Sequence, residues 1–181
     1  MHIINLFGEP GAGKSTMAAA VFNLMKRSRL EVELVTEAAK DYTYDKMFTH
    51  LADQLMVLAE QHHRLFRLRE QVEFVVTDSP VPTGLLFADH KWAGRLHGLI
   101  TDIWGDDTNH SFLVYRPPNV PYQRFGRNQT EEEAAAIAER VRHLVRLFGG
   151  PTVMQVTNSD PAAEYKIVNH VLAAAGRTER V

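Results

Sequence analysis

A short glycine-rich segment constrains the fold of this chain more than any other feature. Residues 8–15 read Gly-Glu-Pro-Gly-Ala-Gly-Lys-Ser, a complete G-x-x-x-x-G-K-S pattern. The mostly apolar residues 3–7 precede it, and residues 14–29, which have helical character, follow it. Such a P-loop joins a β-strand to a helix, because its glycines let backbone N–H groups and the helix N-terminus surround phosphates. The sequence therefore predicts a phosphate-binding strand–loop–helix unit rather than an accidental glycine-rich turn.

The P-loop residues have separate expected roles. Lys14 is expected to bridge β- and γ-phosphate oxygens, Ser15 to ligate Mg²⁺ through its hydroxyl, and Thr16 to contact the α-phosphate. We therefore expect ATP and Mg²⁺ as ligands. The predicted nucleotide-binding residues are Gly8, Glu9, Pro10, Gly11, Ala12, Gly13, Lys14, Ser15 and Thr16.

Apolar, strand-like runs alternate with helical stretches along the whole chain. The expected strands are residues 3–7, 31–36, 73–77, 111–115 and 152–156, and the expected helices are residues 14–29, 44–69, 83–104, 131–148 and 161–175. This alternation predicts an α/β P-loop NTPase fold resembling nucleotide kinases, with a mostly parallel five-stranded sheet and helices on both faces. The 181 residues, of which 45% are hydrophobic, suit a single domain spanning residues 1–181.

Some helix boundaries are marked by local signals. Residues 44–69 carry apolar side chains at three- and four-residue steps, but this stretch is long enough to contain a break. Thr130 and Glu133 have the spacing of a capping box. Asp160 before Pro161 predicts a cap at the start of the last helix.

Two acids follow strands that are expected to be near the P-loop. Asp78 comes directly after the third strand, and Glu37 follows the second. Because the carboxyl ends of parallel strands meet at one edge of a sheet, either acid could accept a proton from an acceptor hydroxyl, and Asp78 could also hold Mg²⁺. Asp78 could instead cap the next helix, and Glu37 could be a solvated acid at a helix start. Which of the two is the base stays open at this point.

Residues 116–130 form the longest irregular segment and are expected to be a lid. Arg116, Arg124 and Arg127 lie in it, and a guanidinium can stabilise the charge that develops on a transferring phosphoryl group. Solvated loop charges are the alternative for each arginine. The predicted catalytic residues are Lys14, Glu37, Asp78, Arg124 and Arg127, and the predicted metal ligands are Ser15 and Asp78.

Two further segments are candidates for base contacts. Phe87, Trp92 and Trp104 follow Asp78 and could stack on a nucleobase, although core packing explains them as well. Asn158 follows the last expected strand, where a loop could contact adenine.

The composition excludes several classes of site. Cysteine is absent, so disulfides, thiolate zinc sites and a cysteine nucleophile are excluded. The net charge of -2 provides no overall attraction for nucleic acid, so any such contact needs a local basic patch. No signal-like leader or membrane-spanning run is recognisable, so we expect a cytoplasmic protein without membrane association.

Other P-loop classes fit less well than small-molecule or nucleotide kinases. Ras-type GTPases use an N-K-x-D guanine motif, whereas the segment after the last strand is Asn-Ser-Asp at residues 158–160. ABC and motor ATPases usually carry two consecutive acids at the end of the strand that corresponds to residues 73–77. In this chain a single acid, Asp78, stands there and Ser79 follows it. The short chain and the arginine-containing loop therefore favour a kinase.

The chain resembles a known family in several segments. These are Asn-Leu-Phe at 5–7 with the P-loop, Leu-Val-Thr-Glu at 34–37, Leu-Ala-Asp-Gln-Leu at 51–55 with Ala-Glu-Gln-His at 59–62, Thr-Asp-Ser-Pro at 77–80, and Gly-Arg-Asn-Gln-Thr-Glu-Glu-Glu at 126–133. Together they resemble bacteriophage-encoded P-loop kinases, within which the hydroxymethyluracil DNA kinases are most similar. Glu37 also resembles the base of deoxyribonucleoside kinases, but Asp-Ser-Pro at 78–80 departs from their Asp-Arg-Ser.

The resemblance implies a function and leaves two alternatives. It implies ATP-dependent phosphorylation of the hydroxymethyl group of 5-hydroxymethyluracil in phage DNA, during thymine hypermodification in the host cytoplasm. The target base would have to leave the DNA stack to reach the site. The alternatives are a nucleoside or nucleoside-monophosphate kinase acting on a free nucleotide, and a non-catalytic ATP-binding switch.

Overall fold

All five strands of the sheet run in the same direction. The computed structural model describes residues 1–123, 130–150, 153–178 and 181. The elements in chain order are β1 (His2–Phe7), α1 (Lys14–Arg27), β2 (Val32–Val35), α2 (Ala38–Tyr44), α3 (Phe48–Ala52), α4 (Gln54–Phe66), β3 (Phe74–Thr77), the 3₁₀ helix η1 (Val81–Leu86), α5 (His90–Gly105), β4 (Thr108–Val114), α6 (Glu131–Phe148), β5 (Met154–Val156) and α7 (Ala163–Ala174). The strand order is β2-β3-β1-β4-β5, and every pairing is parallel. The predicted five-stranded α/β fold is therefore confirmed.

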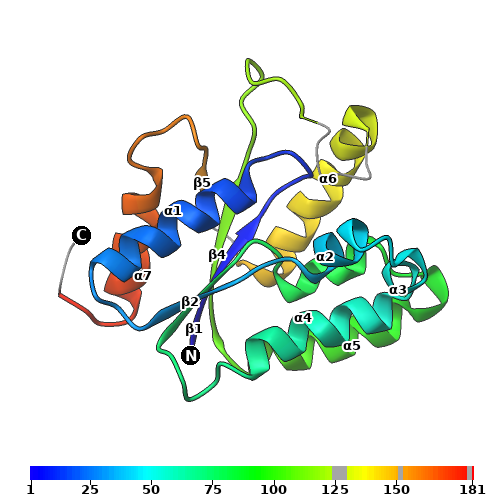
Figure 1. Cartoon of the computed structure of the whole chain (residues 1–181), viewed down its shortest axis with the longest axis horizontal. Coiled ribbons are helices and arrows are strands. Elements are labelled where there is room, and N and C mark those ends of the chain that lie inside the picture. The colour runs from blue at the N-terminus through cyan, green and yellow to red at the C-terminus, as the bar shows by residue number, and fades with distance from the viewer. Residues whose placement is uncertain (124–129, 151–152, 179–180) are drawn as a thin grey trace.

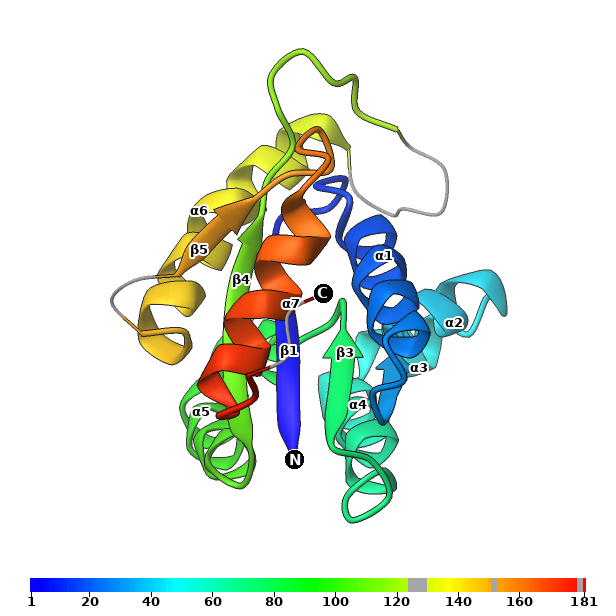
Figure 2. The ribbon, with the colours of Figure 1, turned by 90° about the vertical axis from the view of Figure 1, so that its left-hand side faces the viewer.

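Helices cover both faces of the sheet, so most side chains of the central strand β1 are buried and apolar; Asn5 is a buried polar exception. In β1, Ile4 and Leu6 pack with α1 and α7, whereas Ile3 packs with α4 and α5. Phe7 packs against the buried side chains of α6. Successive residues of a strand point to opposite faces, and both sets are buried here because each face carries a helical layer (Figures 1 and 2).

The register of the sheet brings three loops to one edge. Asn5 of β1 and Val35 of β2 both lie level with Thr77 of β3. The P-loop after β1, Asp78 after β3 and Glu37 after β2 therefore emerge at the same end of the sheet. The segment after β4 also rises beyond this end (Figure 2).

Three predicted helices differ from those observed. The stretch predicted as residues 44–69 contains the expected break, since α3 and α4 are separate helices. Lys46, before α3, has φ 56°. Asp53 caps α4 by accepting hydrogen bonds from the N–H groups of Leu55 and Met56. The stretch predicted as 83–104 is divided into η1 and α5.

The last helix begins later than predicted, and the capping box is present as predicted. Asp160 accepts a hydrogen bond from the N–H of Ala162 in the turn before α7, so it does not cap the first turn of that helix. The capping box of Thr130 and Glu133 is confirmed at the start of α6. Among the helices of the described residues, none combines the length and apolar character needed to cross a bilayer.

Candidate active site

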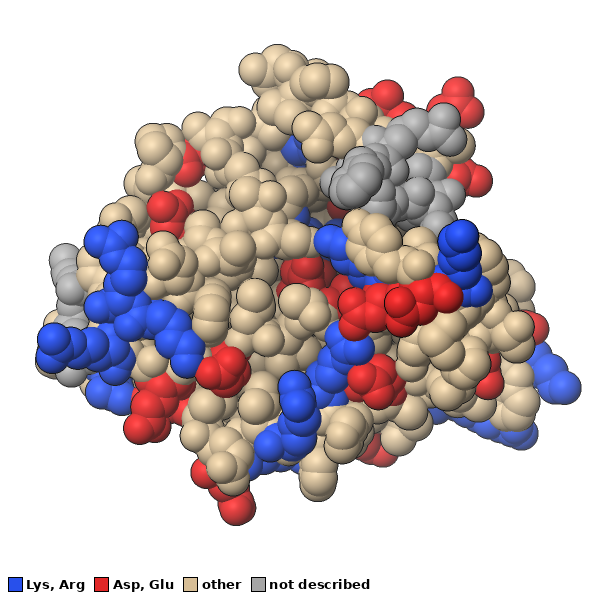
Figure 3. Space-filling model, in the orientation of Figure 1, with Lys and Arg blue, Asp and Glu red and all other residues tan. Residues whose placement is uncertain are grey.

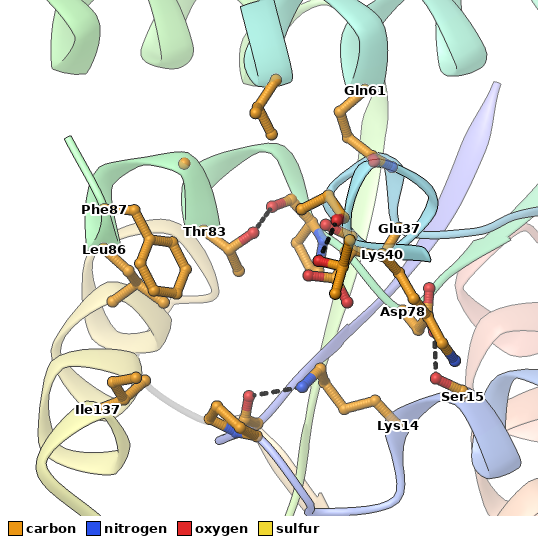
Figure 4. Close-up of a pocket in the computed structure, with 18 of the residues that line it drawn as sticks. Lys14, Ser15, Glu37, Lys40, Gln61, Asp78, Thr83, Leu86, Phe87 and Ile137 are labelled. Carbon is orange, nitrogen blue, oxygen red and sulfur yellow. Dashed lines mark hydrogen bonds between the residues drawn. The ribbon is translucent and has the colours of Figure 1, made fainter. Parts of the chain in front are cut away.

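A cleft of about 530 Å³ lies at the carboxyl edge of the sheet. The P-loop and the start of α1 form one part of its wall, and α2, α3, α4 and η1 form much of the rest. Figure 4 shows Asp78 beside Ser15, on the opposite side of the cleft from Leu86, Phe87 and Ile137. The cleft thus joins a phosphate-binding loop to a second, less polar compartment.

The P-loop ends in a backbone conformation that favours glycine. Gly13 has φ 90°, and a Cβ there would lie 2.0 Å from Nδ2 of Asn158, which donates a hydrogen bond to the Gly13 carbonyl. Lys14 Nζ donates to the carbonyl oxygens of Gly8 at 3.0 Å and Glu9 at 3.2 Å. A side chain at residue 13 would therefore both strain the loop and clash with the β5–α7 connection.

Most of the predicted nucleotide-binding residues line the cleft. Those that do are Gly8, Pro10, Gly11, Gly13, Lys14, Ser15 and Thr16. Ala12 is instead buried below the loop, and Glu9 contributes its carbonyl oxygen to Lys14 and to the N–H of Ala12.

Asp78 is hydrogen-bonded to the P-loop and does not cap a helix. Its Oδ2 accepts a hydrogen bond of 2.6 Å from the Ser15 hydroxyl, while its Oδ1 is buried and without a partner in the described part of the chain. The residue that precedes η1 is Pro80. A hydroxyl oxygen and a carboxylate oxygen with spare capacity suit Mg²⁺, which typically takes only one or two protein ligands beside phosphates. The residues that would hold Mg²⁺ are therefore Ser15 and Asp78.

Within residues 1–123, 130–150, 153–178 and 181, no three His, Asp or Glu side chains are grouped so that they could hold a metal ion. When bound, Mg²⁺ neutralises phosphate charge.

Glu37 lies at the start of α2 and is partly buried, so it is not a solvated acid. Burial raises the pKa of its carboxyl above the ordinary value of 4.5, Lys14 opposes this rise, and Asp78 adds to it. None of the hydrogen bonds or ion pairs found among the described residues uses its carboxylate, and Glu37 does not cap α2 through its side chain. A carboxylate that faces the cleft and keeps its lone pairs available is suited to accept a proton.

Of the three arginines in the expected lid, the structure describes Arg116. Arg116 donates to the Val120 carbonyl and to Glu131, both at 2.7 Å, and so it ties the segment after β4 to the start of α6. Arg124 and Arg127 lie outside the described residues. Gln123, just before them, lines the cleft.

The candidate base-contact residues lie in different environments. Phe87 lines the cleft, whereas Trp104 is partly buried and packs against Phe7 and Phe148. Trp92 is partly exposed on α5, with Lys91 and Arg95 near its ring.

Several polar residues of the cleft were not singled out from the sequence, among them Lys40 of α2 and Gln61 of α4. Gln61 had a recognisable signal, because it is a polar residue on the apolar face of an amphipathic helix, between the buried Leu58 and Leu65.

Comparisons with known proteins agree with this architecture. Among solved structures, a deoxyadenosine kinase from M. mycoides with bound dATP superposes with a TM-score of 0.58 and 13% sequence identity, covering 96% of this chain and 99% of that chain. This likeness shows that the two chains share a fold. A comparison with curated protein sequences found no match. A family model described as an AAA domain matches residues 3–160, and the chain therefore belongs to this AAA domain family, AAA_28.

Proposed function

We propose that this protein transfers the γ-phosphoryl group of ATP to a hydroxyl group of a nucleoside. The observation that carries the proposal is that the P-loop and Glu37 line one cleft of about 530 Å³, which also reaches the apolar side chains of Leu86 and Phe87. Of the alternatives open from the sequence, the fold comparison supports a nucleoside kinase better than a DNA kinase.

In this proposal Glu37 is the base, and Asp78 is a metal ligand. Asp78 already accepts a hydrogen bond from the Ser15 hydroxyl, whereas the Glu37 carboxylate has no such commitment among the described residues. The acceptor O–H bond breaks and its proton moves to Glu37. The acceptor oxygen bonds to the γ-phosphorus, and the bond from that phosphorus to the bridging oxygen breaks, releasing ADP.

The lining of the acceptor compartment favours an uncharged acceptor. Its apolar members include Leu51, Val57, Leu86 and Phe87. Among the described residues that line the cleft, the cationic side chains are Lys14 of the P-loop and Lys40. Phosphate recognition usually relies on several cationic or backbone donors, so a nucleoside fits this compartment better than a nucleoside monophosphate.

A second candidate acceptor is 5-hydroxymethyluracil in DNA, which the family resemblance over residues 5–133 supports. Charge distribution argues against it. On the face shown in Figure 3, Lys and Arg are interspersed with Asp and Glu. The described residues form no continuous basic strip on this face. A protein that binds DNA normally presents such a strip, because phosphate contacts supply much of the affinity.

The test is phosphoryl transfer from labelled ATP in the presence of Mg²⁺. The acceptors are the four deoxyribonucleosides, their monophosphates, ordinary DNA and DNA containing 5-hydroxymethyluracil, with Lys14→Met as the inactive control. We expect labelled nucleoside monophosphate. Transfer to the modified DNA alone would establish the second candidate. Binding of ATP with no transfer to any acceptor would indicate a non-catalytic switch.

A further inference from the structure

Gln61 is a buried polar residue on the apolar face of α4. Its exposed fraction is 5%, and Leu58 and Leu65 on the same face are also buried. A buried amide group without a hydrogen-bond partner destabilises a fold. A glutamine at such a position therefore needs partners for both ends of its amide.

One end of this amide holds the backbone next to Glu37. Oε1 of Gln61 accepts a hydrogen bond of 3.0 Å from the N–H of Ala38, the first residue of α2. Glu37 itself gives this helix start no side-chain hydrogen bond. Gln61 thus ties α4 to the start of α2, from which the Glu37 side chain projects.

The other end of the amide has no partner in the described part of the chain. Nε2 is buried, and Gln61 lines the same cleft as Glu37 (Figure 4). The bond to Ala38 fixes the orientation of the amide, because the Ala38 N–H is a donor and only the oxygen can accept from it. The unused hydrogens of Nε2 remain for a hydrogen-bond acceptor in the cleft.

We propose that Gln61 positions Glu37 through its carbonyl oxygen and binds a hydrogen-bond acceptor of the nucleoside through Nε2. This inference rests on the proposed function and extends it, since it couples occupancy of the acceptor compartment to the placement of the base. A bound nucleoside fixes the Gln61 rotamer and therefore the start of α2.

Two variants separate the two roles. Gln61→Glu keeps an oxygen that can accept from Ala38 but removes the Nε2 donor, and Gln61→Met removes both with little change in volume. Gln71→Met is the matched control, because Gln71 is exposed in the turn before β3. The measurements are KM for the best deoxyribonucleoside of the panel, KM for ATP, kcat, and hydrogen exchange of the Ala38 amide.

We expect both Gln61 variants to raise the nucleoside KM by about tenfold, the usual effect of one lost hydrogen bond. Only Gln61→Met should also lower kcat by about tenfold and speed exchange of the Ala38 amide, with the ATP KM within about twofold of wild type. Gln71→Met should match wild type in all four measurements.

Two results would overturn the inference. The first is an unchanged nucleoside KM in both Gln61 variants, and the second is unchanged Ala38 exchange in Gln61→Met. If wild type phosphorylates no nucleoside, the proposed function fails, while the Ala38 exchange data still decide whether Gln61 positions the residue beside it.

Discussion

Glu37 and Asp78 follow neighbouring strands, but their carboxylates have different surroundings. Asp78 shares a hydrogen bond with Ser15, whereas burial raises the pKa of Glu37 and leaves its carboxylate available. The sequence could place both acids at one edge of the sheet. It could not assign their roles, because the roles depend on which side chains from other elements lie beside each carboxylate.

Replacement of Glu37 by Gln should lower activity and raise stability together. Loss of a general base typically lowers kcat by 10²–10⁴-fold. Because burial raises the pKa of Glu37 in the folded protein above 4.5, the ionised carboxylate destabilises the fold at neutral pH. Glu37→Gln should therefore raise Tm at pH 7, and this gain should shrink as the pH falls toward 4.5.

The measurements are single-turnover rates and thermal unfolding over a pH series. In wild type, kcat/KM should fall as the pH is lowered through a midpoint above 4.5, because the base must be ionised. Normal turnover in Glu37→Gln would contradict its role as the base.

Replacement of Asp78 by Asn should lower turnover by at least about a hundredfold, because it weakens the metal site that stabilises the transferring phosphoryl group. Asn keeps the size of the side chain and can still accept from Ser15, but it removes the charge next to the expected Mg²⁺ position. Binding of an ATP analogue without metal should stay close to wild type, and the Mg²⁺ concentration needed for half-maximal rate should increase. Titration calorimetry and rates at several Mg²⁺ concentrations test this. Near-normal turnover would remove Asp78 from the chemistry.

At the scale of elements, the P-loop depends on a connection far away in sequence. Gly13 ends the loop with φ 90°, and its carbonyl accepts from Asn158, which follows β5. The motif was recognisable from residues 8–15 alone, because all its glycines are local. The contact with Asn158 became visible only when the sheet placed β5 and the P-loop at the same edge.

Replacement of Gly13 by Ala should weaken ATP binding by at least about tenfold, because the new Cβ meets Asn158 and the positive φ disfavours alanine. Adding Asn158→Ala should restore part of the affinity, since it removes the clash but not the strain. Gly98→Ala is the matched control: Gly98 lies in α5 with nothing within 4 Å of a new Cβ, and alanine stabilises a helix interior by about 1 kcal/mol. Equal affinity of Gly13→Ala and wild type for an ATP analogue would contradict this account.

At the scale of the whole molecule, the opposite end of the sheet carries a histidine pair of which His110 is buried and His2 is partly buried. His2 of β1 and His110 of β4 are hydrogen-bonded at 2.9 Å, and His110 is 8% exposed. Burial, His2 and His170 lower the pKa of His110 to about 4. These two strands are central in the sheet, so the protonation of His110 is coupled to global unfolding.

The free energy of unfolding should therefore fall as the pH drops from 6.5 toward 4. In the unfolded chain His110 takes up its proton near pH 6.5, whereas the folded protein resists it until about pH 4. The difference corresponds to about 3 kcal/mol. Urea unfolding at pH 7 and pH 4.5 measures how much free energy of unfolding is lost between the two pH values. This loss should be smaller in His110→Gln than in wild type. The control is His143→Gln, at an exposed position of α6, which should lose as much free energy of unfolding as wild type. An equal loss of free energy of unfolding in His110→Gln and wild type would contradict this explanation.

The sequence by itself determined the P-loop, the five strands, the capping box of Thr130 and Glu133, and the common edge of Glu37 and Asp78. These features depend on side-chain periodicity, backbone preferences and hydrogen bonds between residues a few positions apart. Only the tertiary structure decided that Ser15 meets Asp78 across 63 positions and that Gln61 meets Ala38 across 23. Those contacts exist because helices packed on both faces of a parallel sheet bring distant segments together, and local sequence preferences do not specify which side chains then meet.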